Sequence, residues 1–247
     1  MRRRFTIRLL LLVLFGVQNA SGAGVSVLFV GNSLTQVNDL PSVLSHFAAE
    51  SLSHVQMSVS AITPGGAFLY DHWKSGQALA LLREKRPTFL VLQGQSTEPL
   101  SAPQSFARSA AAFKAEADRL HVKTILFSTW ARPAGDAYYK EPVSGGSPAE
   151  MQARLSSGYA AVARATGATL APVGMGFERA NQLAPQIQLL DGTQHPSAAG
   201  TYLAAAILFR AMFNDSITQS SYYGGMPPEV ALRLQHIAGE IPISPAP

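Results

Sequence analysis

Short apolar runs rich in β-branched residues alternate with longer segments rich in Ala, Leu, Gln, Glu and Arg along most of this chain. The runs have the length of strands and the segments have the length of helices, so the alternation predicts βαβ units and a parallel sheet. We therefore expect an α/β fold with three layers, α/β/α, around a central, mostly parallel five-stranded sheet. The predicted strands are residues 25–30, 56–61, 88–93, 124–128 and 168–172, and the predicted helices are 41–54, 71–85, 103–120, 148–166 and 196–213.

The crossovers of such a sheet are right-handed, so the ends of all parallel strands meet at one edge. Gly31, Gln93 and Ser128 follow or end three of the predicted strands. Ligands of open α/β sheets bind at this carboxyl edge. A functional site is therefore expected there.

The first 23 residues have the pattern of a removable secretion signal. Four arginines among the first eight residues precede an apolar run at 9–17, and Ser21 and Ala23 have the small-residue spacing that a signal peptidase reads. A run of nine residues is too short to span a bilayer, which takes about 20. We expect cleavage after Ala23, a secreted or periplasmic product, one domain at 24–215 and a C-terminal extension at 216–247 packed on it.

Removal of this signal also changes the charge of the protein. The full chain has 19 basic and 15 acidic residues, and loss of four arginines leaves 15 of each. A neutral chain gives no reason to expect nucleic acid or an anionic membrane as partner. Because the chain has no cysteine, disulfides, a thiol nucleophile and a zinc–thiolate site are excluded.

One candidate nucleophile follows the first predicted strand. Ser33 lies in the turn Gly31-Asn32-Ser33-Leu34-Thr35, between a buried strand and a helix. A serine hydroxyl needs a base within hydrogen-bond reach and donors for the oxyanion that forms on attack. Gly, Asn and Ser are also ordinary turn residues, so this segment alone does not decide between a nucleophile and a simple turn.

A candidate base lies near the other end of the chain. His195 follows Asp191 in Leu190-Asp191-Gly192-Thr193-Gln194-His195-Pro196, directly before the last long helix. Histidine can take the serine proton, and an aspartate can fix its tautomer. His72, between Asp71 and Trp73, is the competing histidine.

These two blocks resemble those of the SGNH, or GDSL-type, serine esterase and lipase family. That family opens with a Gly-Asp/Asn-Ser turn near the mature N-terminus and closes with an Asp and a His before the final helix. The resemblance implies a flavodoxin-like fold and a Ser33, His195 and Asp191 triad. It also implies an oxyanion hole formed by Ser33, Gly66 and Gln95.

The chain departs from the family pattern in two places. Gln95 stands where the family has an asparagine, with Gln93 and Ser96 as alternative donors, and three residues instead of two separate Asp191 from His195. The chain has no Gly-x-Ser-x-Gly elbow of the α/β-hydrolases.

The function that this resemblance implies is hydrolysis of acyl esters, short-chain or on carbohydrates, by an exported serine esterase. Asn32, Trp130 and Arg132 are candidates for contact with a small-molecule or polysaccharide ester. No cofactor or metal is expected, because the chain has no phosphate-binding loop and no His-Glu-x-x-His. The alternatives are a secreted carbohydrate-binding or envelope-associated protein of the same fold with little catalysis, and an acyltransferase.

Overall fold

The computed structural model describes residues 24–50, 56–218 and 220–243. The predicted signal segment, 1–23, lies outside the described residues. No helix in these described ranges combines the length and the apolar character needed to cross a bilayer.

Five parallel strands form the centre of the molecule, in the order β2-β1-β3-β4-β5. Val27 of the first strand pairs with Val59 on one side and with Phe89 on the other. This order is the flavodoxin-like arrangement, and it confirms the predicted α/β fold. The strands are β1 (Val25–Val30), β2 (Met57–Ile62), β3 (Phe89–Leu92), β4 (Lys123–Phe127) and β5 (Thr169–Ala171).

Alternate residues of the central strands enter two separate cores. Phe29, Val91 and Phe127 face the first core, whereas Leu28 and Leu90 face the second. Both faces of β1 and β3 are therefore buried, which explains why these segments are almost entirely apolar.

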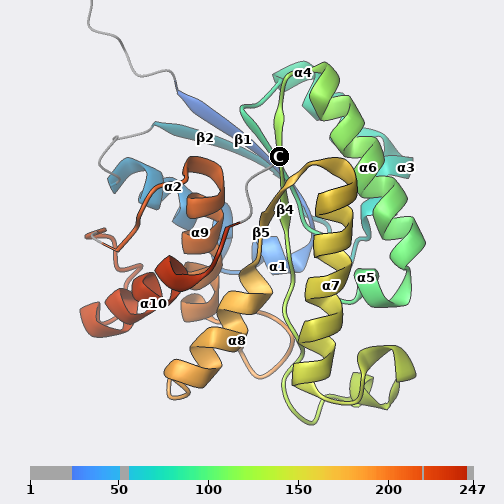
Figure 1. Cartoon of the computed structure of the whole chain (residues 1–247). Coiled ribbons are helices and arrows are strands. Elements are labelled where there is room, and N and C mark those ends of the chain that lie inside the picture. Colours follow the sequence, from blue (N-terminus) through green and yellow to red (C-terminus); the bar gives the residue numbers. More distant parts are fainter. Residues whose placement is uncertain (1–23, 51–55, 219, 244–247) are drawn as a thin grey trace, which may run out of the picture.

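Helices cover the two faces of the sheet (Figure 1). One face carries α2 (Leu40–Glu50), α8 (Val173–Leu183), α9 (Ala198–Phe213) and α10 (Pro228–Glu240). The other carries α3 (Leu69–Ser75), α4 (Gln77–Lys85), α6 (Pro103–Arg119) and α7 (Pro148–Thr166). The shorter helices are α1 (Ser33–Gln36), α5 (Glu98–Ser101) and the 3-10 turns η1 (Val37–Asp39), η2 (Ala137–Lys140) and η3 (Pro142–Ser144).

Two predicted helices differ from the observed ones. The segment expected as one helix at 71–85 is two helices, since Gly76 adopts a left-handed conformation with φ 72° between them. The last long helix begins at Ala198 and not at Pro196, because the Ser197 side chain accepts a hydrogen bond from the Gly200 N–H as its N-cap. Helix α8 was not predicted, and neither was the short helix α5.

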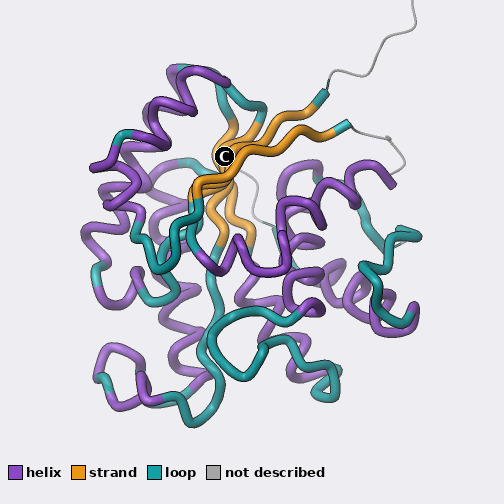
Figure 2. The backbone as a smooth tube through the Cα atoms, turned by 180° about the vertical axis from the view of Figure 1, so that it is seen from behind, coloured by secondary structure: helices purple, strands orange, loops and turns teal. Residues whose placement is uncertain are grey.

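The turns after β1, β3 and β4 lie at the carboxyl edge of the sheet, and longer loops fill the space beyond the strands (Figure 2). The C-terminal helix α10 packs against α8 and α9 and contributes Leu234 and Ile237 to the first core. The site described next is built from the carboxyl-edge turns and the segment before α9.

Candidate active site

The turn after β1 presents Ser33 at the start of α1, where its side chain is partly exposed. Asn32 is the N-cap of this helix, and its side-chain oxygen accepts from the Leu34 N–H at 3.1 Å. The amide nitrogen of Asn32 donates to the carbonyls of Ala67 at 3.0 Å and Gly94 at 3.5 Å. Asn32, predicted to contact substrate, is thus buried, and its side chain bonds within the protein, where it joins three turns.

Gln93, which directly follows β3, fixes the same turn by hydrogen bonds from its side chain. Its side-chain oxygen accepts from the Asn32 N–H at 3.1 Å and from the Thr35 hydroxyl at 3.0 Å. A Cβ at Gly31 would lie 2.7 Å from that oxygen, so only glycine fits there. Gln93 is 1% exposed, and its role is to fix the position of Ser33.

His195 lies beside the serine, although 162 residues separate the two in the chain. The distance from His195 Nε2 to Ser33 Oγ is 3.0 Å. The Trp130 indole donates to the Gln194 carbonyl at 3.1 Å, and the Asn38 amide donates to the Pro196 carbonyl at 2.9 Å. These two bonds hold the histidine segment from both sides.

The competing histidine has another partner. His72 Nε2 lies 2.7 Å from the Gly31 carbonyl, which can only accept, so this nitrogen carries a proton. Burial lowers the pKa of His72, and its bonds to Gly31 and the charge of Asp71 oppose this shift. His72 thus supports the turn below Ser33, while His195 is the histidine in reach of the hydroxyl.

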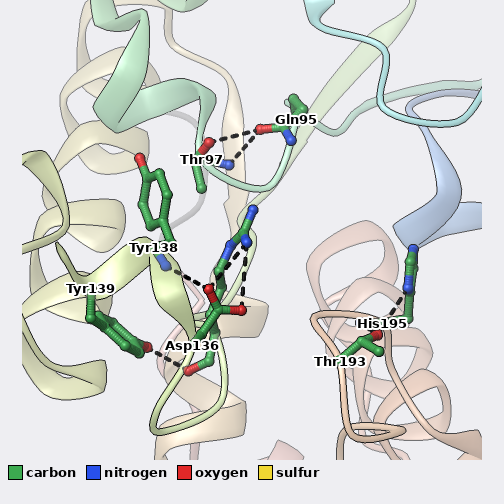
Figure 3. Close-up of polar contacts among 8 residues, drawn as sticks. Gln95, Thr97, Asp136, Tyr138, Tyr139, Thr193 and His195 are labelled. Atoms are coloured by element: carbon green, nitrogen blue, oxygen red, sulfur yellow. Dashed lines mark hydrogen bonds and ion pairs between the residues drawn. The ribbon is translucent and has the colours of Figure 1, made fainter. Parts of the chain in front are cut away.

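Asp191 is not the group that contacts the far side of the His195 ring. The Thr193 hydroxyl lies 3.1 Å from His195 Nδ1 (Figure 3). The same hydroxyl lies 2.6 Å from an oxygen of Asp191. The Thr193 N–H also donates to that oxygen at 2.9 Å. These bonds from Thr193, and the nearby His195, lower the pKa of Asp191. Apart from the extra residue between Asp191 and His195, no sequence feature indicates this intervening threonine.

Three groups were predicted to donate to an oxyanion at Ser33. The N–H groups of Ser33 and Gly66 have no hydrogen-bond partner among the described residues. The Gln95 side-chain oxygen accepts from the Thr97 N–H at 2.7 Å and the Thr97 hydroxyl at 3.0 Å. Its amide nitrogen consequently faces away from Thr97 (Figure 3).

Two of the predicted substrate contacts differ in their surroundings. Trp130 is 3% exposed and stacks on Phe177, with ring centroids 4.2 Å apart. The ring predicted to contact substrate therefore belongs to the core. Arg132 is half-buried, 3.4 Å from Asp136 and 4.8 Å from the centre of the Tyr138 ring.

The described part of the chain contains no group of three or more His, Asp or Glu side chains that could hold a metal ion. The arrangement therefore consists of a serine, a histidine and polar donors at the carboxyl edge of a parallel sheet. These are the parts that nucleophilic attack on a carbonyl requires.

Comparison with solved structures identifies the family. A protein from Slackia heliotrinireducens assigned to the SGNH hydrolases is 30% identical, with a TM-score of 0.64 over 76% of this chain and 99% of that one. No protein-family model matches the sequence, and no curated protein is significantly similar to it. This chain belongs to the SGNH hydrolases.

Two more distant structures share the fold. A DUF4886 family protein from Bacteroides uniformis has a TM-score of 0.70 at 16% identity, over 87% of this chain and 93% of its own. A catalytic mutant of an acetylxylan esterase from Geobacillus stearothermophilus has a TM-score of 0.61 at 14% identity, over 78% and 95%.

Proposed function

We propose that this protein is a serine esterase in which Ser33 attacks the carbonyl carbon of an ester. The observation that carries this proposal is the 3.0 Å distance between His195 Nε2 and Ser33 Oγ. That distance lets the imidazole take the hydroxyl proton as the new C–O bond forms.

The oxyanion of the tetrahedral intermediate needs hydrogen-bond donors. The Ser33 N–H, the Gly66 N–H and the Gln95 amide are the groups proposed for this role, since all three are free of competing partners among the described residues. Return of the proton from His195 then releases the alcohol and leaves an acyl group on Ser33. Water, activated by the same histidine, hydrolyses this acyl-enzyme.

The substrate class proposed is an acyl ester with a short chain, including acetyl groups on carbohydrates. The shared fold of the acetylxylan esterase supports carbohydrate acetates. Arg132 is the remaining candidate for substrate contact, because its side chain is partly exposed. It lies in the loop after β4, in which the Thr129 hydroxyl donates to the Ser96 carbonyl next to Gln95.

The test is hydrolysis of a chromogenic acetate ester by the purified protein beside Ser33→Ala. Ser42→Ala is the matched control, because Ser42 lies nearby in α2 and only its backbone is hydrogen-bonded. We expect turnover in the wild type and in Ser42→Ala, and none above background in Ser33→Ala. Equal rates in all three proteins would contradict the proposal.

The same experiment distinguishes two alternative functions, acyl transfer and carbohydrate binding. Acyl transfer gives an acylated sugar in place of free acetate when a sugar acceptor is added. A carbohydrate-binding protein with little catalysis gives no turnover in any variant.

Export is part of this proposal, since residues 1–23 have the pattern of a secretion signal. Expression of the full chain in a bacterium should yield a periplasmic or secreted product whose first residue is Gly24. A product that keeps its first 23 residues and stays in the cytoplasm would contradict export.

A further inference from the structure

We infer that Thr193 is a positioning residue that links Asp191 to His195, so that four side chains act in series: Ser33, His195, Thr193 and Asp191. This inference rests on the proposed function of Ser33 and His195. It differs from a direct triad because the carboxylate acts through a hydroxyl group.

The protons of the series can be assigned from the hydrogen-bond partners. A carboxylate can only accept, so the single hydroxyl proton of Thr193 points to Asp191 across the 2.6 Å contact. The Thr193 oxygen must then accept from His195 Nδ1, 3.1 Å away. The neutral ring thus carries its proton on Nδ1, and Nε2 offers a lone pair to the Ser33 hydroxyl.

The same oxygen also receives the backbone N–H of His195 at 3.1 Å. A hydroxyl has one proton and two lone pairs, and all three are used here. Each bond excludes a rotation of the Thr193 side chain or of the His195 ring. The arrangement therefore holds the imidazole in the tautomer and orientation that a base for Ser33 needs.

The length of the loop explains why a threonine lies between the two groups. The Asp191 N–H donates to the His195 carbonyl at 3.1 Å, and Leu190 pairs with Pro196 as an antiparallel bridge. Gly192 takes a φ of 96° that favours glycine. This turn places three residues between Asp191 and His195. The Asp191 carboxylate therefore accepts a hydrogen bond from Thr193, and Thr193 in turn contacts the imidazole ring of His195.

During attack, the Ser33 proton moves to His195 Nε2 and the ring becomes an imidazolium. The Nδ1 proton stays on the ring, and the Thr193 hydroxyl keeps its own proton toward Asp191. The negative charge of Asp191 stabilises the cation through the aligned hydroxyl dipole. Because Asp191 and Thr193 are exposed, solvent weakens this effect relative to a buried acid.

The variant that tests the series is Thr193→Val, which keeps the shape of threonine and removes the hydroxyl. Loss of a hydrogen bond next to a charged group predicts a fall in kcat of about 10- to 100-fold, with KM unchanged within about twofold. Thr193→Ser retains the hydroxyl and should restore kcat to within about threefold of the wild type. A merely structural threonine would not give this separation of kcat from KM.

A double-mutant cycle identifies the partner. If Asp191 acts through Thr193, Asp191→Asn should lower kcat by about as much as Thr193→Val, and the double variant should be no slower than either. Multiplied losses in the double variant would overturn the series. An unchanged kcat in Thr193→Val would also overturn it.

A second measurement separates this inference from the proposed function. The rate at which a fluorophosphonate labels Ser33 depends on the base and not on the choice of ester. If the wild type is labelled but does not hydrolyse acetate esters, hydrolysis fails as the function, and slower labelling of Thr193→Val still supports the series. Equal labelling of both proteins overturns it, and absence of labelling in the wild type overturns both proposals.

Discussion

At the scale of single residues, Ser33 depends on partners from distant segments. Gln93 holds its turn from below, Asn32 joins that turn to two others, and His195 lies 3.0 Å from its hydroxyl. A serine hydroxyl is a weak nucleophile without such a base. The proposed reactivity of Ser33 is thus a property of the assembled edge and not of its own turn.

Gln95 tests the proposed oxyanion site at this scale. Loss of one oxyanion donor typically costs about 10² to 10³ in rate, and we expect a fall in kcat of that size for Gln95→Ala. Gln95→Glu keeps an oxygen acceptor for Thr97 but offers no amide proton, so it should be equally slow. Both variants are measured with the chromogenic acetate ester.

The matched control is Gln104→Ala, an exposed glutamine on α6. It should keep wild-type turnover. Full activity in Gln95→Ala and Gln95→Glu would remove this amide from the site.

Ser33 and His195 could be predicted from the sequence because each stands at a fixed place, one after a buried strand and one before a helix. The burial of Trp130 and Asn32 could not be predicted. The sequence around a polar or aromatic turn residue does not tell whether its side chain faces solvent or the core. Thr193 was missed for a related reason. Its contact with His195 depends on how one extra residue folds into the turn.

At the scale of elements, one buried carboxylate joins two turns of the site. Glu98 of α5 accepts from the Gln95 N–H at 2.9 Å and from the Leu69 N–H at 3.1 Å. The first bond fixes the Gln95 turn, and the second fixes the start of α3 after Gly66. The two segments that carry proposed oxyanion donors are therefore linked through a fully buried side chain.

This carboxylate predicts a pH dependence of stability. Burial raises the pKa of Glu98, so the folded protein retains this proton at pH values where the unfolded chain has released it. The stabilisation is fully present below about pH 4.3, the pKa of an unfolded glutamate, and is lost as the pH rises through the higher folded pKa.

The control for this dependence is Glu98→Gln, whose amide oxygen can accept the same N–H groups but does not titrate. The free energy of unfolding of the wild type should fall relative to that of the variant over this pH range, as measured by urea unfolding. A difference that stays constant with pH would contradict a raised pKa for Glu98.

At the start of α9, Gly200 packs so closely on the His195 loop that a larger residue should destabilise the protein. A Cβ at Gly200 would lie 2.1 Å from the Leu189 carbonyl, which accepts from the Ser197 N–H at the base of the His195 loop. Gly200→Ala should therefore destabilise the protein by about 1–3 kcal/mol and lower turnover.

Gly239→Ala is the matched helical control. Gly239 lies in α10, and its Cβ would be 3.3 Å from a methyl group of Thr218, a side chain that can move. Urea unfolding should show a change of less than about 1 kcal/mol for this variant, since alanine favours helix. Equal effects of the two substitutions would contradict the close approach at Gly200.

The strands were predictable within one or two residues. For β1, β3 and β4, which are largely buried, the reason is that a run buried on both faces must be apolar. The break in the segment 71–85 was not, since Gly76 is tolerated within a helical pattern and only its φ of 72° ends the helix. Helix α8 contains Gly174 and Gly176, which disfavour a helix in isolation. A Cβ at Gly174 would lie 2.2 Å from the Thr129 carbonyl, so tertiary packing explains that sequence.

At the scale of the whole molecule, the strand order brings the Ser33 turn and the His195 segment together. β1 lies in the interior of the sheet, between β2 and β3, and α9 packs on α2, the long helix that follows the Ser33 turn. Ser33 and His195 therefore meet at one carboxyl edge although most of the domain lies between them in the chain.

The central claim is that Ser33 is a nucleophile activated by His195. It is tested most directly by the mass of the intact protein and of its peptides after reaction with a fluorophosphonate. We predict one adduct, located on Ser33, absent in Ser33→Ala, retained in Ser42→Ala and formed much more slowly in His195→Ala. An adduct on another serine, or equal labelling rates in the wild type and His195→Ala, would contradict the claim.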